Sequence, residues 1–383
     1  MTQITPFAID IPDAELTDLK VRLEGTRWAR PDPAGDWSRG VPENYLRGLT
    51  KYWAGGFDWR AREAALNALP QFTTEVEGQA FHFVHLKSKE KNALPLVLCH
   101  GWPGSFVEFE RIIAPLADPV AHGGKAEDAF DVIVPSLPGF GYSTPLNGPG
   151  WDLSRSTKAY AAIMERLGYG RYGAHGSDIG AGIAGHLASF WPDRLVGVHV
   201  ASDPGTLQPV GTYLPMPADL SEAEKAELDA IKAAGRDGDG YSRQQASKPQ
   251  TLAYGLGDSP AAQLAWIVEK FKEWTNPSKP LPETAVDRDQ LLTNIALYWF
   301  TNSGGSSAQF YWESTHGTAG WIAPSDAPQG WSVFNTHPLM RRIMDPTRKS
   351  AFWADHPEGG HFPAMEEPAL LIEDIRAFFR TVR

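Results

Sequence analysis

The fold is decided by the stretch Ala174-His175-Gly176-Ser177-Asp178-Ile179-Gly180. It has the Gly-x-x-x-Gly frame of a nucleophile elbow, a sharp turn between a strand and a helix that lifts one side chain above the edge of a sheet. Esterases and lipases carry serine at the lifted position, whereas this chain carries Asp178. A carboxylate needs no base before it attacks an sp³ carbon, and the product of that attack is an alkyl ester. The stretch therefore predicts the opening of a strained ring or the displacement of a halide, not ester cleavage by a serine.

The segments around this stretch favour an elbow. Residues 131–135 contain a continuous apolar run that is typical of a short buried strand. Residues 180–188 open a helix with small side chains, although glycine lowers helix propensity, so we expect them to pack closely against a neighbouring strand. Taken alone, the stretch also fits a surface turn, because Gly, Ser and Asp are common turn residues.

A second motif, Leu96-Val97-Leu98-Cys99-His100-Gly101-Trp102-Pro103-Gly104-Ser105, joins an apolar strand to a Gly/Pro-rich turn. A turn at this place before an elbow supplies a backbone N–H to the oxyanion hole. We assign that N–H to Trp102 and a second one to Ile179, the residue after the lifted aspartate. His100 is expected to be a buried, hydrogen-bonded residue of the turn rather than a catalytic one.

A third motif, Glu358-Gly359-Gly360-His361-Phe362-Pro363-Ala364-Met365-Glu366, lies close to the C-terminus. Nucleophile first and histidine last is the chain order of hydrolases that use such an elbow. Of the eleven histidines, only His361 has this setting, in a tight loop before a final helix that we expect over 369–380. The pattern predicts that His361 is the catalytic base.

These motifs resemble those of the epoxide hydrolases of the α/β-hydrolase fold, in the branch related to the microsomal enzyme. Residues 6–12 and 16–30 look like the N-terminal extension of that branch, and residues 248–256, 258–260 and 266–271 look like its cap domain. The resemblance implies an α/β fold with a mostly parallel central sheet, a helical cap insertion and an N-terminal wrapping extension. It also implies that the chain opens an epoxide to a vicinal diol.

The chain is expected to divide into four segments. Residues 1–80 form the N-terminal extension, 81–206 the first part of the core, 207–318 the helical cap and 319–383 the second part of the core. Residues 1–80 lack the strand–helix alternation of the core, which we expect to begin with the alternating strand at 80–85.

In the resembled family two cap tyrosines donate hydrogen bonds to the epoxide oxygen, where negative charge develops as the ring opens. They match Tyr241, shortly before the Lys-Pro pair at 248–249, and Tyr311, in Phe310-Tyr311-Trp312-Glu313. A phenol suits this role because it is an uncharged donor at neutral pH. Without the motif match, either tyrosine could equally be an ordinary packing residue.

The expected reaction has two steps. Asp178 attacks the epoxide and forms an ester, and a water activated by His361 then attacks the ester carbonyl. The N–H groups of Trp102 and Ile179 hold the oxyanion. A carboxylate should orient His361 and stabilise its charged form.

The sequence departs from the family at this carboxylate. It usually follows a Phe-Pro-x-Glu or Phe-Pro-x-Asp segment in the loop before the histidine, but here the chain reads Phe334-Asn335-Thr336-His337. Either Asp345 serves after a shift in alignment, or the acid has moved. Related hydrolases also place it after the strand that follows the elbow helix, where this chain has Asp203, at the edge of the sheet that carries such sites. Asp203 begins an Asp-Pro-Gly turn and could serve only as its cap, but we predict that it supports His361.

Composition excludes some partners. The net charge of −11 argues against nucleic acids and anionic membranes. The single cysteine, Cys99, allows no intramolecular disulfide, which suits a reducing compartment.

Neither a signal peptide nor a run of ~20 apolar residues is recognisable, and the chain starts where the anchor of microsomal relatives would end. We expect a soluble, cytoplasmic enzyme of detoxification or secondary metabolism that acts on a small-molecule epoxide without cofactor or metal; the resemblance is compatible with a homodimer.

Two other functions stay open. A haloalkane dehalogenase uses the same aspartate and histidine, but needs side-chain N–H donors for the halide in place of the tyrosines, and Trp102 could supply one. A non-catalytic ligand-binding protein on a decayed hydrolase scaffold is suggested only by His337. The presence of the aspartate, the histidine and both tyrosines together argues against that binding protein.

Overall fold

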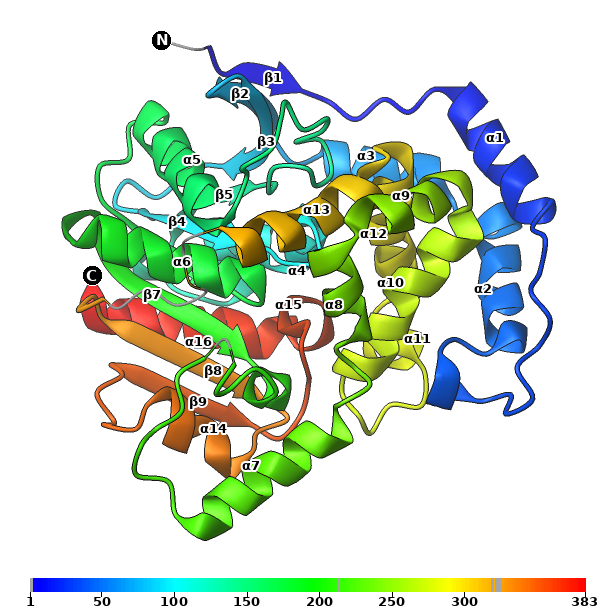
Figure 1. Ribbon diagram of the computed structural model, residues 1–383. Coiled ribbons are helices and arrows are strands. Elements are labelled where there is room, and N and C mark those ends of the chain that lie inside the picture. Colours follow the sequence, from blue (N-terminus) through cyan, green and yellow to red (C-terminus); the bar gives the residue numbers. More distant parts are fainter. Residues whose placement is uncertain (1–2, 213, 318–319, 321–324) are drawn as a thin grey trace.

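A nine-stranded sheet forms the centre of the computed structural model, which describes residues 3–212, 214–317, 320 and 325–383 (Figure 1). The strands are β1 (Thr5–Phe7), β2 (Gln71–Val76), β3 (Gln79–Leu86), β4 (Leu94–Cys99), β5 (Phe130–Pro135), β6 (Tyr172–Gly176), β7 (Leu195–Ser202), β8 (Gln329–Phe334) and β9 (Phe352–His356). They lie side by side in the order β1-β2-β3-β5-β4-β6-β7-β8-β9. The six neighbouring strands β5, β4, β6, β7, β8 and β9 run parallel, whereas β1, β2 and β3 are antiparallel to their neighbours. Because helices cover both faces, the central strands are mostly apolar, and every residue of β7 is buried.

Helices connect the strands and cover the sheet. They are α1 (Asp13–Glu24), α2 (Glu43–Gly55), α3 (Trp59–Asn67), α4 (Glu110–Ala117), α5 (Leu153–Arg166), α6 (Ile179–Phe190), α7 (Glu222–Ala234), α8 (Gly240–Ser247), α9 (Pro249–Asp258), α10 (Pro260–Trp274), α11 (Pro282–Ala285), α12 (Arg288–Phe300), α13 (Ser303–His316), α14 (Pro338–Met344), α15 (Pro363–Glu366) and α16 (Pro368–Val382). Helices α5 and α6 pack together on one face of the sheet, and α4 and α16 on the other (Figure 1). Across the described ranges, no helix is both long enough and apolar enough to cross a membrane.

Three glycines in adjacent strands let α16 lie close to the sheet. A Cβ at Gly173 would lie 2.4 Å from the Phe379 ring, and a Cβ at Gly197 or Gly330 would lie 2.7 or 2.6 Å from the Phe378 ring. The two aromatic rings therefore occupy the space that side chains of β6, β7 and β8 would fill. This contact anchors the last helix, which directly follows the loop of the third sequence motif.

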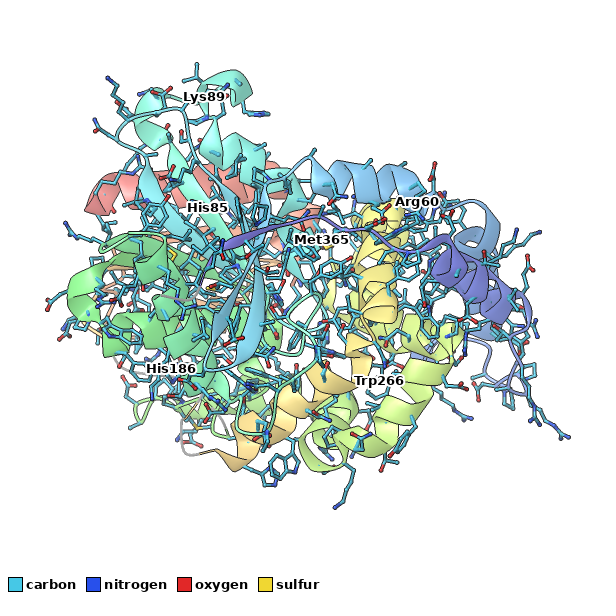
Figure 2. The ribbon with its side chains drawn as sticks, turned by 90° about the horizontal axis from the view of Figure 1, so that it is seen from above. Arg60, His85, Lys89, His186, Trp266 and Met365 are labelled. Atoms are coloured by element: carbon cyan, nitrogen blue, oxygen red, sulfur yellow. The ribbon has the colours of Figure 1, made fainter. Side chains whose placement is uncertain are left out.

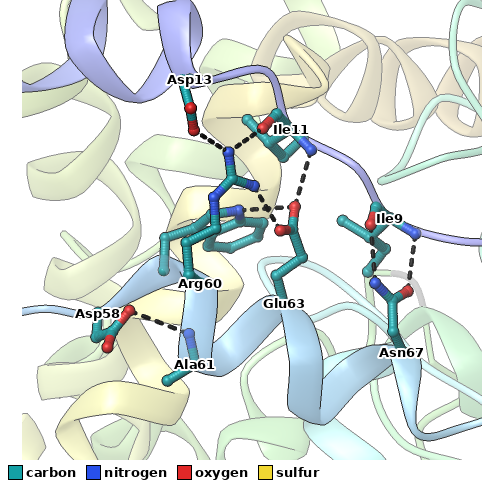
Figure 3. Close-up of polar contacts among 9 residues, drawn as sticks. Ile9, Ile11, Asp13, Asp58, Arg60, Ala61, Glu63 and Asn67 are labelled. Atoms are coloured by element: carbon teal, nitrogen blue, oxygen red, sulfur yellow. Dashed lines mark hydrogen bonds and ion pairs between the residues drawn. The ribbon is translucent and has the colours of Figure 1, made fainter.

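The N-terminal segment contributes two strands to the sheet, β1 and β2, ahead of the strand at 80–85 with which we expected the core to begin. Strand β1 pairs with β2, and β2 forms a hairpin with β3. Figure 3 shows how the chain after β1 is tied to α3: Asn67 bonds both the N–H and the carbonyl of Ile9 at 2.8 Å, and Glu63 accepts the N–H of Ile11 at 2.8 Å. Arg60 bridges this carboxylate, the Ile11 carbonyl and Asp13. This segment is held by side chains of residues that are far from it in the sequence. A local sequence pattern does not reveal such contacts.

In the sequence, helices α7 to α13 come between β7 and β8. In space they lie on the side of the sheet to which β7, β8 and β9 point (Figure 1). Trp266 of α10 donates from Nε1 to Gln245 Oε1 of α8 at 3.1 Å, and Figure 2 places Trp266 among these helices. Helix α7 lies apart from them, because Leu228 packs with Leu339 and Met340 of α14. The expected boundary at 318 and 319 lies outside the described residues.

The elbow at Asp178 is held by close backbone contacts. Asp178 has φ 52° and ψ −129°, a backbone conformation that is strained for any residue with a side chain. A Cβ at Gly180 would lie 1.8 Å from the carbonyl oxygen of Cys99 in β4, and a Cβ at Gly176 would lie 2.2 Å from the carbonyl oxygen of Gly180. The glycine frame is thus required by the packing of α6 on the sheet, as the small residues predicted.

Replacing Gly180 by alanine should therefore destabilise the protein strongly. We expect Gly180→Ala to lower the free energy of unfolding by about 3 kcal/mol or more, because the new methyl group overlaps the Cys99 carbonyl group. Gly185→Ala is the matched control: it lies in the same helix with nothing within 4 Å of the new Cβ. That variant should gain about 0.5–1 kcal/mol from helix propensity. Urea unfolding followed by circular dichroism measures both, and equal midpoints would show that this contact does not hold the elbow.

Candidate functional site

Asp178 stands where strand β6 turns into helix α6, and the turn before η2 (Phe106–Phe109) faces it. The backbone N–H of Trp102 donates to Asp178 Oδ1 at 2.9 Å. A Cβ at Gly101 would lie 2.2 Å from the same oxygen, so only glycine lets the turn approach the carboxylate this closely. The N–H assigned to the oxyanion hole therefore already points at the predicted nucleophile. Ile179, the other residue assigned to that hole, is the first residue of α6 and is buried.

His100 holds the turn in place, as the sequence predicted. It is fully buried, and its Nε2 accepts the N–H of Leu137 at 3.1 Å. Its Nδ1 lies 3.1 Å from the Gly101 carbonyl oxygen. Burial lowers the pKa of His100 to about 4, so the ring is neutral at physiological pH and acts as a hydrogen-bonding spacer.

His361 lies between two carboxylates. Its Nδ1 is 2.8 Å from Asp203 Oδ2, and its Nε2 is 3.5 Å from Asp178 Oδ2. The His361 N–H donates to the Trp274 carbonyl at 2.8 Å, and a Cβ at Gly360 would lie 2.6 Å from that carbonyl oxygen. The Gly-Gly-His sequence therefore lets the loop press against the end of α10. The three ionisable groups form one line, from the nucleophile to the residue after β7.

The charges of the site favour the protonated ring. Burial by itself would lower the pKa of His361, but the carboxylates of Asp203 and Asp178 outweigh burial and hold its pKa well above the usual value. An imidazolium between two anions is the stable resting arrangement. Loss of the charge on either carboxylate would shift His361 towards its neutral form.

The two carboxylate oxygens of Asp203 contact different partners. Oδ1 accepts the N–H of Gly205 at 2.7 Å, which makes Asp203 the cap of the short turn that the Asp-Pro-Gly sequence predicts. Oδ2 faces His361. Asp203 is 9% exposed, so most of its solvation is replaced by these contacts.

The two alternative residues lie elsewhere. Asp345 accepts the N–H of Lys349 at 2.8 Å and the hydroxyl of Ser350, and so closes the turn after α14. His337, at the place where the family carries its acid, caps α14 by accepting the N–H of Leu339 at 3.3 Å. The structure brings Asp203, not Asp345, to His361.

Tyr241 and Tyr311 both lie against Trp102 in an aromatic cluster above Asp178. The Tyr241 ring stacks on the Trp102 ring with 4.9 Å between centroids, and the Tyr311 ring stands edge-on to it at 5.9 Å. A hydrogen bond joins the two tyrosines. Burial, together with the negative charge of Asp178, raises the pKa of both phenols, so both hydroxyls keep their protons and can donate.

Sequence reasoning missed two residues that complete the site. Trp274 packs its ring 5.0 Å from that of His361 and 5.1 Å from that of Tyr241. Glu108 lines the small cavity beside Asp178 and His361, accepts the Ser177 hydroxyl at 3.3 Å, and has its pKa raised to about 7 by burial. A carboxylate inside an otherwise apolar segment was the available signal for Glu108. Within the described part of the chain, no group of three His, Cys, Asp or Glu side chains is arranged to hold a metal ion.

The chain is similar to known proteins over nearly its whole length. Residues 4–109 match a family model described as "Epoxide hydrolase N terminus", and residues 95–251 match one described as "alpha/beta hydrolase fold". A Stigmatella aurantiaca protein named "Putative epoxide hydrolase" is 45% identical over 99% of this chain and 86% of its own length. "Epoxide hydrolase 1" of Sus scrofa is 34% identical over 98% of this chain and 88% of its own. The solved structure of an Aspergillus niger epoxide hydrolase has a TM-score of 0.83 and 33% identity, and the match covers 100% of this chain and 97% of that one.

The charge arrangement predicts how His361 titrates. Asp203→Asn removes an anion next to the imidazolium, so the pKa of His361 should fall towards its usual value. Asp345→Asn is the control and should leave the pKa of His361 unchanged, because the Asp345 carboxylate contacts Lys349, Ser350 and Arg341 around its own turn. NMR titration of nitrogen-labelled histidine measures both. Equal titration of His361 in the two variants would contradict the pairing with Asp203.

Proposed function

This chain belongs to the epoxide hydrolase family of the α/β-hydrolase fold, and we propose that it opens its epoxide through a covalent ester on Asp178. The proposal is carried by one observation, the line of Asp178, His361 and Asp203 with the Trp102 N–H on the nucleophile. Such a line supplies a nucleophile, a base for the second step and an anion that compensates the charge of the base. The substrate is a small molecule, while a homodimer and a cytoplasmic location remain predictions.

In the first step a carboxylate oxygen of Asp178 attacks one ring carbon, and the bond from that carbon to the epoxide oxygen breaks. Tyr241 and Tyr311 reach the same space from α8 and α13, above Trp102. We assign them to donate hydrogen bonds to the epoxide oxygen as the alkoxide forms, and one of the two phenols then gives its proton to that alkoxide. The product is a hydroxyalkyl ester of Asp178.

The second step follows from the change in charge. Once Asp178 is an ester it no longer stabilises the imidazolium, so the pKa of His361 falls from its raised resting value. The ring then gives up its proton, which replaces the one that the phenol gave to the alkoxide. Neutral His361 then takes a proton from the water that attacks the ester carbonyl, and Asp203 stabilises the imidazolium that forms again. The N–H groups of Trp102 and Ile179 hold the oxyanion until the acyl–oxygen bond breaks and the diol leaves.

The ester mechanism predicts where an oxygen label goes. In a single turnover of styrene oxide in heavy-oxygen water, with enzyme in excess, the label should enter the Asp178 carboxylate while the diol stays unlabelled. The reason is that water attacks the ester carbonyl and not the epoxide carbon. Mass spectrometry of the peptide and of the diol gives both answers. Label found in the diol of the first turnover would overturn the proposal, and halide release from a haloalkane, without diol release, would restore the dehalogenase alternative.

The proposed role of Asp203 predicts a trapped intermediate. Asp203→Asn should let the ester form but slow its hydrolysis by about 100-fold or more, because the imidazolium formed in that step loses its compensating anion. Whole-protein mass after mixing with substrate should then show the added mass of the epoxide. Asp345→Asn, the control, should turn over normally. A trapped ester in the Asp345 variant, with normal turnover in the Asp203 variant, would assign the acid to the other residue.

A further inference from the structure

Lys270 of α10 is a buried lysine beside the site. Its side chain is 2% exposed, and its ammonium pairs with Glu269 at 2.8 Å and Glu273 at 2.6 Å. The two carboxylates are themselves 29% and 39% exposed, so water reaches the partners but not the cation. Burying an ammonium group is costly even when it is paired, and an apolar residue of similar length would pack in its place. Packing alone therefore does not explain why a lysine occupies this position.

The ammonium of Lys270 lies against the aromatic rings of the site. Its Nζ is 5.1 Å from the centroid of the Tyr241 ring and 5.8 Å from that of Trp274. A cation within about 6 Å of an aromatic face is attracted by the ring, and more strongly where water is excluded. Tyr241 and Trp274 are the two rings of the cluster that contact Trp102 and His361 respectively. Lys270 thus lies against the ring of Tyr241, the proposed hydrogen-bond donor, and against the ring of Trp274, which packs on the proposed base His361.

The other charges near Tyr241 make it a poorer donor. Burial, then the anion of Asp178, and to a smaller extent Glu273, raise the pKa of Tyr241. A phenol that holds its proton more tightly gives a weaker hydrogen bond to an alkoxide. A positive charge at the ring acts in the opposite direction, because it stabilises the negative charge that moves onto the phenol oxygen as the epoxide opens.

We propose that Lys270 is a positioning residue for ring opening, which holds the Tyr241 ring on Trp102 and strengthens its hydroxyl as a hydrogen-bond donor. This inference rests on the proposed role of Tyr241 in the ester mechanism. It assigns no contact between Lys270 and the substrate. The lysine acts through the ring, so its effect requires the Tyr241 hydroxyl.

The test separates ring opening from ester hydrolysis by rapid mixing with styrene oxide. Lys270→Met keeps the length of the side chain and removes the charge, and it should slow ester formation about tenfold, in line with a water-excluded cation–π contact, while hydrolysis of the formed ester keeps its rate. Lys270→Arg should retain most of the parent rate. Lys272→Met is the matched control on the same helix, where the ammonium contacts the Lys279 carbonyl instead of the rings, and it should behave as the parent.

A double-mutant cycle shows whether the effect passes through the phenol. In a Tyr241→Phe background, Lys270→Met should cause no further loss, since the hydroxyl that it strengthens is absent. In the parent background its effect should grow across a series of epoxides as the leaving alkoxide becomes more basic. A purely structural lysine would slow the two backgrounds equally and all substrates alike.

Each other outcome is decisive. Ester formation at the parent rate in Lys270→Met, or an equal loss in both backgrounds, overturns the inference and leaves the ester mechanism intact. Absence of label in Asp178 of the parent chain overturns the mechanism itself. If Lys270→Met does not fold, Lys270→Gln takes its place, and if neither neutral variant folds, the lysine is a structural residue and the inference is wrong.

Discussion

The site depends on one close contact, that of helix α6 with strand β4 at Gly180 and the Cys99 carbonyl. Because the helix begins directly against the sheet, the chain must turn sharply after β6, and Asp178 takes the strained conformation at the turn. The same closeness brings the Gly101–Trp102 turn onto the carboxylate. The proposed nucleophile and the N–H group that donates to it are therefore placed by backbone geometry, and side-chain packing only has to hold that backbone in position.

Charge balance explains how a carboxylate at another position can take the place of the usual acid beside His361. His361 needs an anion at Nδ1, and the direction from which that anion comes does not matter to the ring. Strands β7 and β8 are parallel neighbours, so the residues after their carboxyl ends lie at the same edge of the sheet. Asp203 follows β7 and reaches His361, while His337, after β8, is free to cap α14. The departure from the family pattern therefore moves the carboxylate from the end of β8 to the end of β7, at the same edge of the sheet.

The cap closes the site with aromatic rings rather than with charges. Tyr241, Trp274 and Tyr311 surround Trp102, which belongs to the core, so the donors are positioned by ring packing across the two layers. Trp102 and Tyr311 are buried and Tyr241 and Trp274 are partly buried, so a charge beside this cluster acts over a longer range than it would in solvent. Lys270 is the cation that the cap contributes to this environment.

The sequence by itself determined the elements whose geometry is local. The elbow, the turn at Trp102 and the Gly-Gly-His loop each carry glycines where a side chain would not fit. These glycine patterns can be read in the sequence, so their motifs predicted the α/β-hydrolase fold and the positions of Asp178 and His361. Only the tertiary structure decided what depends on distant partners. It paired β1 with β2, brought Asp203 to His361 where the sequence had favoured Asp203 but left Asp345 as an alternative, and set Lys270 against the Tyr241 ring. These choices rest on the packing of segments far apart in the chain, because a charge or a strand finds its partner in space and leaves no periodic pattern in the sequence.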